Sequence, residues 1–202
     1  MGESEWSLPR LCGAEDDALD DAEPVDFFLP QTSYGPRGHL ICTAVAYALG
    51  YSFVAPPHEP LRLCLSARRI DKCMRACHAF FEAHDITTEL MLRDMQRWFP
   101  LARYGVCEGE VAGLTTLPTE KDGLTDDGKL LLEPLNALLD RIRGRAQTSR
   151  LALVVTYEGH TRLLFSTEPG ALCAFDPLHG PLKDLPLPRG VEYAGLLLAT
   201  AT

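Results

Sequence analysis

The sequence predicts an α+β domain in which helices come first and an antiparallel sheet comes last. Apolar residues at helical spacing dominate the first two thirds of the 202 residues. Short apolar runs separated by tight turns occupy the last third, as in a meander of strands. Helices followed by strands are typical of α+β domains rather than of alternating βαβ units. The length and the 46% hydrophobic content predict a single globular core.

The chain begins with an acidic segment that we expect to be flexible. Residues 1–30 hold nine acidic residues and one basic residue, a net charge of −8, whereas the rest of the chain is close to neutral. Such a segment, poor in aromatic residues, offers little apolar surface for packing. We therefore predict residues 1–26 as a flexible lead-in and residues 27–202 as a single domain.

Composition excludes several classes of protein. The body of the chain has no basic excess, which argues against binding to nucleic-acid backbones. No apolar run approaches the roughly 20 residues that crossing a bilayer requires, so we expect a soluble protein without membrane contact. Seven cysteines, an odd number spread along the chain, favour a reducing compartment over a disulfide-stapled secreted domain.

Three helices are predicted before the middle of the chain. The first is a short buried helix over 40–49, which we expect Gly50 to end. The second follows Ser66 as N-cap and buries one face, with charged residues on the other. The third covers about 88–99 and ends at Pro100.

The second half is predicted to contain one more helix and then the sheet. Residues 102–127 resemble an irregular connection, and 129–145 form a further long helix. Strands are expected at 151–157, 160–166, 171–175 and 191–200, with Glu158-Gly159 as a tight turn and 177–190 as a covering loop.

Cys73, Cys77 and His78 are the nearest approach to a metal-binding pattern. Residues four apart share one face of a helix, but no second group of ligands follows at zinc-like spacing. We interpret the two cysteines as small buried hydrophobic residues. No metal and no organic cofactor is expected.

A cysteine early in the chain and a histidine and an aspartate late in it suggest a thiol-based site. Cys42 lies near the start of a helix, where unpaired N–H groups and the helix dipole favour a thiolate and can hold an oxyanion. Gln31, on the preceding loop, is a side-chain donor that can complete the oxyanion hole. His160 follows a turn and Asp176 ends the next strand, so antiparallel pairing can bring them together as base and orienting acid.

Each of these residues also fits a structural role. A cysteine on an apolar helix often belongs to the core, and Asp-Pro is an ordinary start of a turn. The combination, in the order that a papain-like fold requires, favours a catalytic triad.

The sequence resembles the N-terminal deubiquitinase domain of the herpesvirus large tegument protein, a family of cysteine peptidases. The resemblance covers about residues 27–185. It rests on YGPRG at 34–38 followed by Cys42 and its apolar helix, on the helical segments ARRIDKCMRACHAFFEAH and LRDMQRWFPL, and on GHTRLLFSTEPGALCAFDPLHG. It implies a papain-like fold that cleaves ubiquitin from proteins, with Cys42 as nucleophile, Gln31 as oxyanion donor, and Asp176 with His179 as the acid–base pair.

The sequence departs from that family at two positions. The family separates its Asp and His by one residue, whereas two residues separate Asp176 and His179 here. Residues i and i+3 of a strand do not share a face, so His179 needs a turn or bulge to face Cys42. Val45 stands where the family tends to carry a polar residue. Either His160 has taken the role of the base, or the site is damaged.

These observations lead to two hypotheses. The first is a deubiquitinase, a thiol peptidase that removes ubiquitin or a ubiquitin-like protein from conjugates. The alternative is a catalytically inactive relative of papain-like fold that acts as a viral tegument or host-interaction binding module. We expect the acidic segment to contact other viral or host proteins, and we expect the protein in the host cytoplasm or nucleus or in the virion tegument.

Overall fold

The computed structural model describes residues 6–14, 29–55, 66–115, 150–165, 173–182 and 192–200. Its elements run in the order α1 (Leu8–Leu11), η2 (Gln31–Tyr34), η3 (Gly38–Leu40), α2 (Cys42–Val54), α4 (Ala67–Ala83), α5 (Leu92–Trp98), η4 (Leu101–Tyr104), β1 (Val106–Thr115), β2 (Leu151–Tyr157), β3 (His160–Phe165), β4 (Cys173–Asp176), β5 (Gly180–Leu182) and β6 (Glu192–Thr200). Helices come first and most strands last, as the sequence predicts.

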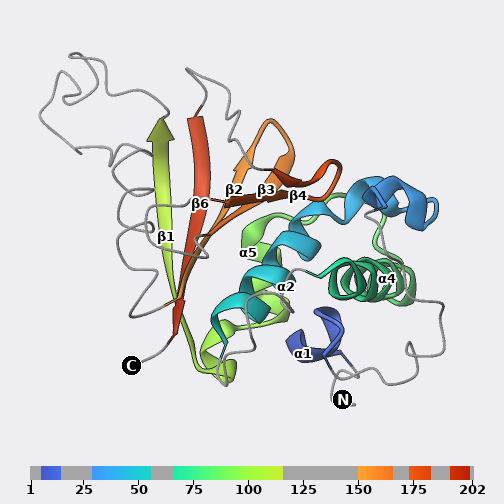
Figure 1. Cartoon of the computed structure of the whole chain (residues 1–202), viewed down its shortest axis with the longest axis horizontal. Helices are drawn as coiled ribbons and strands as arrows, with labels where there is room; N and C mark the ends of the chain where they lie inside the picture. Colours follow the sequence, from blue (N-terminus) through green and yellow to red (C-terminus); the bar gives the residue numbers. More distant parts are fainter. Residues whose placement is uncertain are drawn as a thin grey trace, which may run out of the picture.

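The six strands form one antiparallel sheet in the order β1-β6-β2-β3-β4-β5. Figure 1 shows α2 crossing beside this sheet, with α4 and α1 farther from the strands. The predicted strands 151–157, 160–166, 171–175 and 191–200 correspond to β2, β3, β4 and β6. The last strand does not extend the meander, because β6 pairs with the other edge of β2, through Leu151↔Ala199 to Thr156↔Ala194.

The helix α2 is the centre of the core. All thirteen of its residues are buried, as expected for a helix that is apolar on every side. It packs against β2 and β3 on one side and against α1, α4 and α5 on others. The position of this buried helix is therefore fixed by packing against both the sheet and the other helices.

The prediction that Gly50 ends this helix is wrong, because α2 continues to Val54. A Cβ atom at Gly50 would lie 2.9 Å from the Leu198 side chain and 3.1 Å from that of Leu163. The glycine therefore allows a close approach between α2 and the sheet. Of the loop predicted over 51–65, residues 51–54 are helical, and residues 56–65 lie outside the described residues.

The helix α4 forms as predicted from Ser66, whose hydroxyl accepts a hydrogen bond from the N–H of Arg69 at 3.2 Å. The predicted helix at 88–99 is shorter, since α5 begins at Leu92. Asp94 fixes this start by accepting a hydrogen bond from the N–H of Met91 at 2.9 Å. The helix predicted at 129–145 lies outside the described residues.

Two segments differ from the prediction of irregular structure. Within 102–127, β1 pairs with β6, from Val106↔Thr200 to Thr115↔Glu192. Within the predicted loop 177–190, β5 pairs with β4. Both strands form because a neighbouring strand supplies their hydrogen-bond partners, a contribution that local composition does not reveal.

The predicted boundary at residue 27 needs a correction, because residues 6–14 belong to the folded core. Ser7 caps α1, and Leu8, Leu11 and Cys12 are buried against the rest of the core. The Trp6 ring packs edge-on against Phe80 of α4. Leucines at i and i+3 share a helix face, so even one turn can fill a gap between α2 and α4. All nine acidic residues of segment 1–30 lie outside the described residues.

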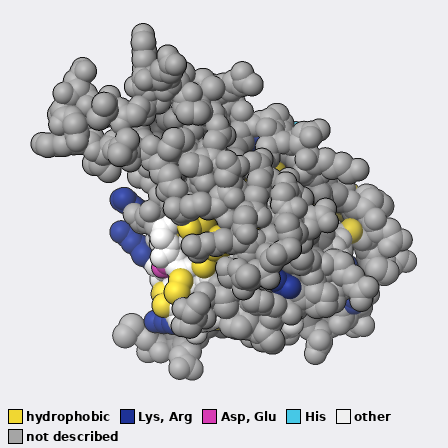
Figure 2. Space-filling view, turned by 60° about the vertical axis from the view of Figure 1, so that its left-hand side comes forward, with side chains coloured by type: hydrophobic (Ala, Val, Ile, Leu, Met, Phe, Trp, Pro, Cys, Tyr) yellow, Lys and Arg dark blue, Asp and Glu magenta, His cyan; other side chains and the backbone are white. Residues whose placement is uncertain are grey.

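The space-filling view brings the β1 side of the molecule forward (Figure 2), where described hydrophobic side chains lie together beside Lys or Arg side chains. Within the described residues, no helix is both long enough and apolar enough to cross a membrane.

Candidate active site

Cys42 is the first residue of α2, all thirteen residues of which are buried. At this position its N–H belongs to the first turn, whose amide donors have no partner within the helix. No side chain caps this end of α2. The residue is buried, with 2% of its surface exposed. The start of α2 therefore offers backbone donors beside a thiol.

A tight loop brings Gln31 to the same place. A Cβ atom at Gly38 would lie 2.2 Å from the backbone oxygen of Gln31, so only glycine permits this approach. Gln31 is buried, and its Nε2 donates to the backbone oxygen of His39 at 3.3 Å. Its Oε1 has no hydrogen-bond partner among the described residues. The Gln31 N–H donates to the backbone oxygen of Pro177 at 3.0 Å, which joins this loop to the residue after Asp176.

The loop that carries Gln31 is anchored on α4. The Tyr34 hydroxyl donates to Asp71 at 2.8 Å, and Arg37 donates to the backbone oxygen of Phe81 and to Asp85, each at 2.6 Å. Burial, together with the hydrogen bond to Asp71, raises the pKa of Tyr34, so it stays a neutral donor. The segment YGPRG thus has a structural task, which is to hold the Gln31 loop against α4.

The sheet places His160 and Asp176 in contact. The pairing Leu163↔Phe175 puts Arg162 one step further along β3, opposite Asp176. Residues two apart in a strand share a face, so His160, Arg162 and Asp176 all lie on one side. His160 Nε2 lies 3.0 Å from Asp176 Oδ1, and Arg162 Nε donates to Oδ2 at 2.6 Å. Asp176 is fully buried, whereas the His160 side chain is 20% exposed.

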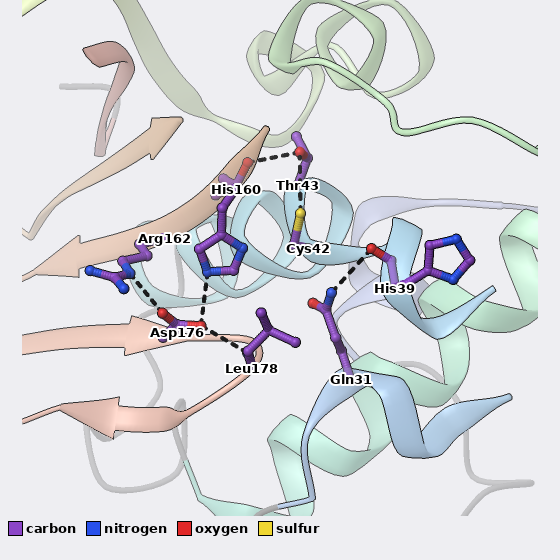
Figure 3. Close-up of polar contacts among 9 residues, drawn as sticks. Gln31, His39, Cys42, Thr43, His160, Arg162, Asp176 and Leu178 are labelled. Atoms are coloured by element: carbon purple, nitrogen blue, oxygen red, sulfur yellow. Dashed lines mark hydrogen bonds and ion pairs between the residues drawn. The ribbon is translucent and has the colours of Figure 1, made fainter. Parts of the chain in front are cut away.

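The His160 ring lies between Asp176 and Cys42 in the close-up (Figure 3). Because Nε2 binds the carboxylate, the other ring nitrogen, Nδ1, is free to face the thiol. Hydrogen bonds to Asp176 and to Cys42 outweigh burial and raise the pKa of His160 to about 9. The arrangement favours a protonated imidazole between a thiol and a carboxylate.

Asp176 is held as a carboxylate despite its burial. Burial by itself raises its pKa, but hydrogen bonds from His160 and from the N–H of Leu178, together with the charges of His160 and Arg162, lower the pKa to about 2. The Leu178 N–H donates to Oδ1 at 2.8 Å. Asp176 is therefore ionised at neutral pH.

His179 lies in the turn between β4 and β5 and is exposed. Its N–H donates to the backbone oxygen of Asp176 at 3.0 Å, which closes the turn Asp-Pro-Leu-His. The two residues between Asp176 and His179 thus form a turn rather than a continuation of the strand. Of the two candidate histidines, it is His160 that contacts both Cys42 and Asp176.

Three site features escaped the sequence reasoning. The first is the contact of Arg162 with Asp176. The position of Arg162, two residues after His160 on a predicted strand, indicates that the two side chains share a face. Thr43 and Thr161, the residues that follow Cys42 and His160, join their hydroxyls at 2.8 Å, and Thr156 lies 3.0 Å from Thr161. No local pattern reveals a contact over 118 residues.

Other cysteines in the described residues have different surroundings. Cys73 and Cys77 are fully buried on α4, as predicted for small hydrophobic residues. Burial raises the pKa of the Cys73 thiol well above its usual range and that of Cys12 to about 12. Neither is suited to form a thiolate at neutral pH. Among the described side chains, no cluster of His, Cys, Asp or Glu could hold a metal ion.

Comparison with known proteins identifies the fold. No family model matches the sequence, and no curated protein matches it. The structure is similar to that of the ubiquitin-specific protease encoded by murine cytomegalovirus tegument protein M48, solved in complex with a ubiquitin-based suicide substrate. The TM-score is 0.53 at 15% sequence identity, over 86% of this chain and 84% of that chain. This similarity confirms the predicted papain-like α+β fold.

Proposed function

We propose that this protein is a cysteine peptidase that removes ubiquitin or a ubiquitin-like protein from conjugates. The observation that carries the proposal is the contact of His160 with both Cys42 and Asp176, at the N-terminus of the central helix. The fold likeness to a ubiquitin-specific protease supports ubiquitin as the substrate class. A thiol, an imidazole and a carboxylate in this order are sufficient for acyl transfer without a metal.

In the proposed cycle, His160 holds the proton of Cys42 as an imidazolium, and the thiolate attacks the carbonyl carbon of the bond to be cleaved. The developing oxyanion accepts hydrogen bonds from the Cys42 N–H and from Gln31 Nε2. His160 then protonates the departing amine, which leaves a thioester on Cys42. Water attacks this thioester with His160 as base, releasing the ubiquitin carboxylate and restoring the thiol.

The supporting residues have distinct roles in this proposal. Asp176 holds the ring of His160 with Nδ1 toward the thiol and stabilises the imidazolium. Gln31 supplies an amide donor that stays neutral at all pH values. His179 has no part in the chemistry, because its ring is exposed in the β4–β5 turn.

The wider assignments belong to the same proposal. We propose one catalytic domain, extended at its N-terminal end by residues 6–14, whose partners are ubiquitin or a ubiquitin-like protein. We propose a location in the virion tegument or in the host cytoplasm or nucleus; the tegument origin of the similar structure supports the first of these.

Cleavage of a fluorogenic ubiquitin C-terminal amide tests the proposal. The wild-type protein should release the fluorophore, and Cys42→Ala should lose the activity while remaining folded. Cys107→Ala is the matched control, because Cys107 is an exposed thiol on β1. Loss of activity in Cys107→Ala with full activity in Cys42→Ala would contradict the assignment.

One observation favours the alternative, an inactive binding module of the same fold. Cys42 is 2% exposed, so a substrate carbonyl reaches the sulfur only if the surrounding side chains move. An inactive module would bind ubiquitin without cleaving it. Titration calorimetry with free ubiquitin, beside the cleavage assay, separates binding alone from catalysis.

A further inference from the structure

Arg162 lies closer to the Asp176 carboxylate than either His160 Nε2 or the Leu178 N–H does. Its Nε donates to Oδ2 at 2.6 Å, and both side chains are buried, with 10% and 0% of their surfaces exposed. The guanidinium carbon lies 5.3 Å from the centre of the Tyr157 ring, so an aromatic face supports the cation on its other side. A buried cation is costly unless it is paired, so this placement needs the carboxylate.

The carboxylate of Asp176 is fixed by bonds to both of its oxygens. Oδ1 accepts from His160 Nε2 and from the Leu178 N–H, and Oδ2 accepts from Arg162. Oδ1 therefore stays directed at the imidazole as long as Oδ2 is held. Without Arg162, the Asp176 carboxylate loses the hydrogen bond to Oδ2 that sets its rotation. It also keeps a buried negative charge that no longer has the guanidinium as its partner.

We propose that Arg162 is a positioning residue, which holds the Asp176 carboxylate so that its other oxygen orients His160 toward Cys42. The proposal rests on the proposed function for its catalytic meaning, and on the described contacts for its geometry. In this role Arg162 acts through Asp176.

The charge of Arg162 has a second consequence. A fixed cation near a carboxylate and an imidazole disfavours an extra proton on either of them. The charge of Arg162 therefore helps to keep Asp176 ionised. It also limits how far Asp176 can raise the proton affinity of His160. A base that holds its proton less tightly returns it more readily to the leaving amine.

Within the part of the chain that the structure describes, charged and titratable groups face His160 and Asp176 from α2, β2, β3 and β4. Cys42 faces His160 from α2, Asp176 faces it from β4, and the Tyr157 ring on β2 lies 6.2 Å from it, edge-on. Glu158 in the β2–β3 turn acts on Tyr157 together with Arg162 and Asp176. Arg162 is the cation among these groups, so its removal should raise the apparent pKa values of the Asp176–His160 pair.

The test is the pH profile of Cys42 alkylation by iodoacetamide, measured by mass spectrometry on the peptide that contains Cys42. In Arg162→Met, the upper apparent pKa should rise by about one unit. The cleavage rate constant kcat/KM should fall about 10-fold to 100-fold, because the base is less well oriented. Arg162→Lys keeps the charge and should return the upper pKa to the wild-type value, with kcat/KM only partly restored.

Arg150→Met is the control, because Arg150 lies at the opposite end of the β2–β3 hairpin, against Phe53. It removes one charge and should leave the alkylation profile unchanged. Circular dichroism confirms that each variant is folded, and Arg162→Lys remains informative if Arg162→Met does not fold.

An unchanged upper pKa in folded Arg162→Met, or the same shift in Arg150→Met, would overturn the proposal. An Arg162→Lys protein with both the wild-type alkylation profile and the wild-type kcat/KM would also contradict the proposal, because the guanidinium would then be dispensable. The alkylation assay needs no ubiquitin. A protein that fails to cleave ubiquitin but shows the shift contradicts the proposed function and leaves the role of Arg162 intact.

Discussion

At the residue scale, the charges of His160 and Asp176 link the site to folding stability. The pKa of His160 is raised from 6.5 to about 9, so its contribution is complete below pH 6.5 and is lost as pH rises through 9. The pKa of Asp176 is lowered from 3.8 to about 2, so its contribution is complete above pH 3.8 and is lost as pH falls through 2. The pair therefore stabilises the fold most between about pH 4 and 6.5.

His160→Gln should accordingly lower the free energy of unfolding by about 2 kcal/mol at pH 6, allowing for the partial exposure of the ring. The difference from the wild-type protein should shrink as pH rises from about 6.5 through 9 and should be nearly gone above pH 9. Urea unfolding at a series of pH values measures it. A difference that stays constant from pH 6 to 10 would show that the imidazole carries no extra proton in the folded state.

The two histidines should differ sharply in catalysis. His160→Ala should reduce kcat/KM for a ubiquitin amide by about 100-fold to 10,000-fold, because it removes the general base. His179→Ala should stay within about threefold of the wild-type rate, since exposed turn residues contribute little to catalysis or stability. The reverse ranking in a steady-state assay would transfer the role of base to His179.

Sequence reasoning proposed the candidate site residues but could not choose between these histidines. Cys42, Gln31, His160 and Asp176 follow from helix and strand ends, which local patterns reveal. The choice depends on whether Asp176 continues the strand or begins a turn, and the bond of Leu178 N–H to its side chain decides this. Neither the resemblance nor the spacing carries that information.

At the scale of elements, a buried hydroxyl contact joins α2 to the sheet beside the site. Thr43 and Thr161 follow Cys42 and His160 directly, and their bond at 2.8 Å fixes the first turn of α2 against β3. Cys42 and His160 are thus each one residue from this fixed contact.

Thr161→Val should reduce kcat/KM about 10-fold, because a small displacement of thiol and ring is costly in catalysis. It should also lower the free energy of unfolding by about 1 to 3 kcal/mol, because buried hydroxyls lose a partner. Thr161→Ser keeps the hydroxyl and should restore most of the rate. Equal rates in Thr161→Val and the wild-type protein would mean that other contacts set the position of Cys42.

The elements that local sequence patterns predicted are those stabilised by interactions within the element itself. The helix α4 has its own cap and apolar face, and the β2–β3 hairpin has Glu158 and Gly159, both at positive φ, as its turn. The continuation of α2 beyond Gly50 depends instead on its packing against the sheet. The formation of β1 likewise depends on its pairing with another strand of that sheet. Such long-range contacts override local preference.

At the scale of the whole molecule, residues 6–14 complete the core from the N-terminal side. Leu11 on α1 is fully buried in the cluster that contains α2 and α4. Leu11→Ala should lower the free energy of unfolding by about 2 to 5 kcal/mol, as for other buried leucines. Met91→Ala, at an exposed position, should change it by less than about 0.5 kcal/mol. Equal effects of the two substitutions in urea unfolding would place α1 outside the cooperative core.

The central claim is that the fold brings Cys42, His160 and Asp176 together as a site for ubiquitin conjugates. A ubiquitin probe with an electrophilic C-terminus tests it most directly, with the modified residue located by mass spectrometry. We expect one covalent ubiquitin on Cys42, which Cys42→Ala abolishes and His160→Ala slows strongly. No adduct with correctly folded wild-type protein, or an adduct on another cysteine, would contradict it.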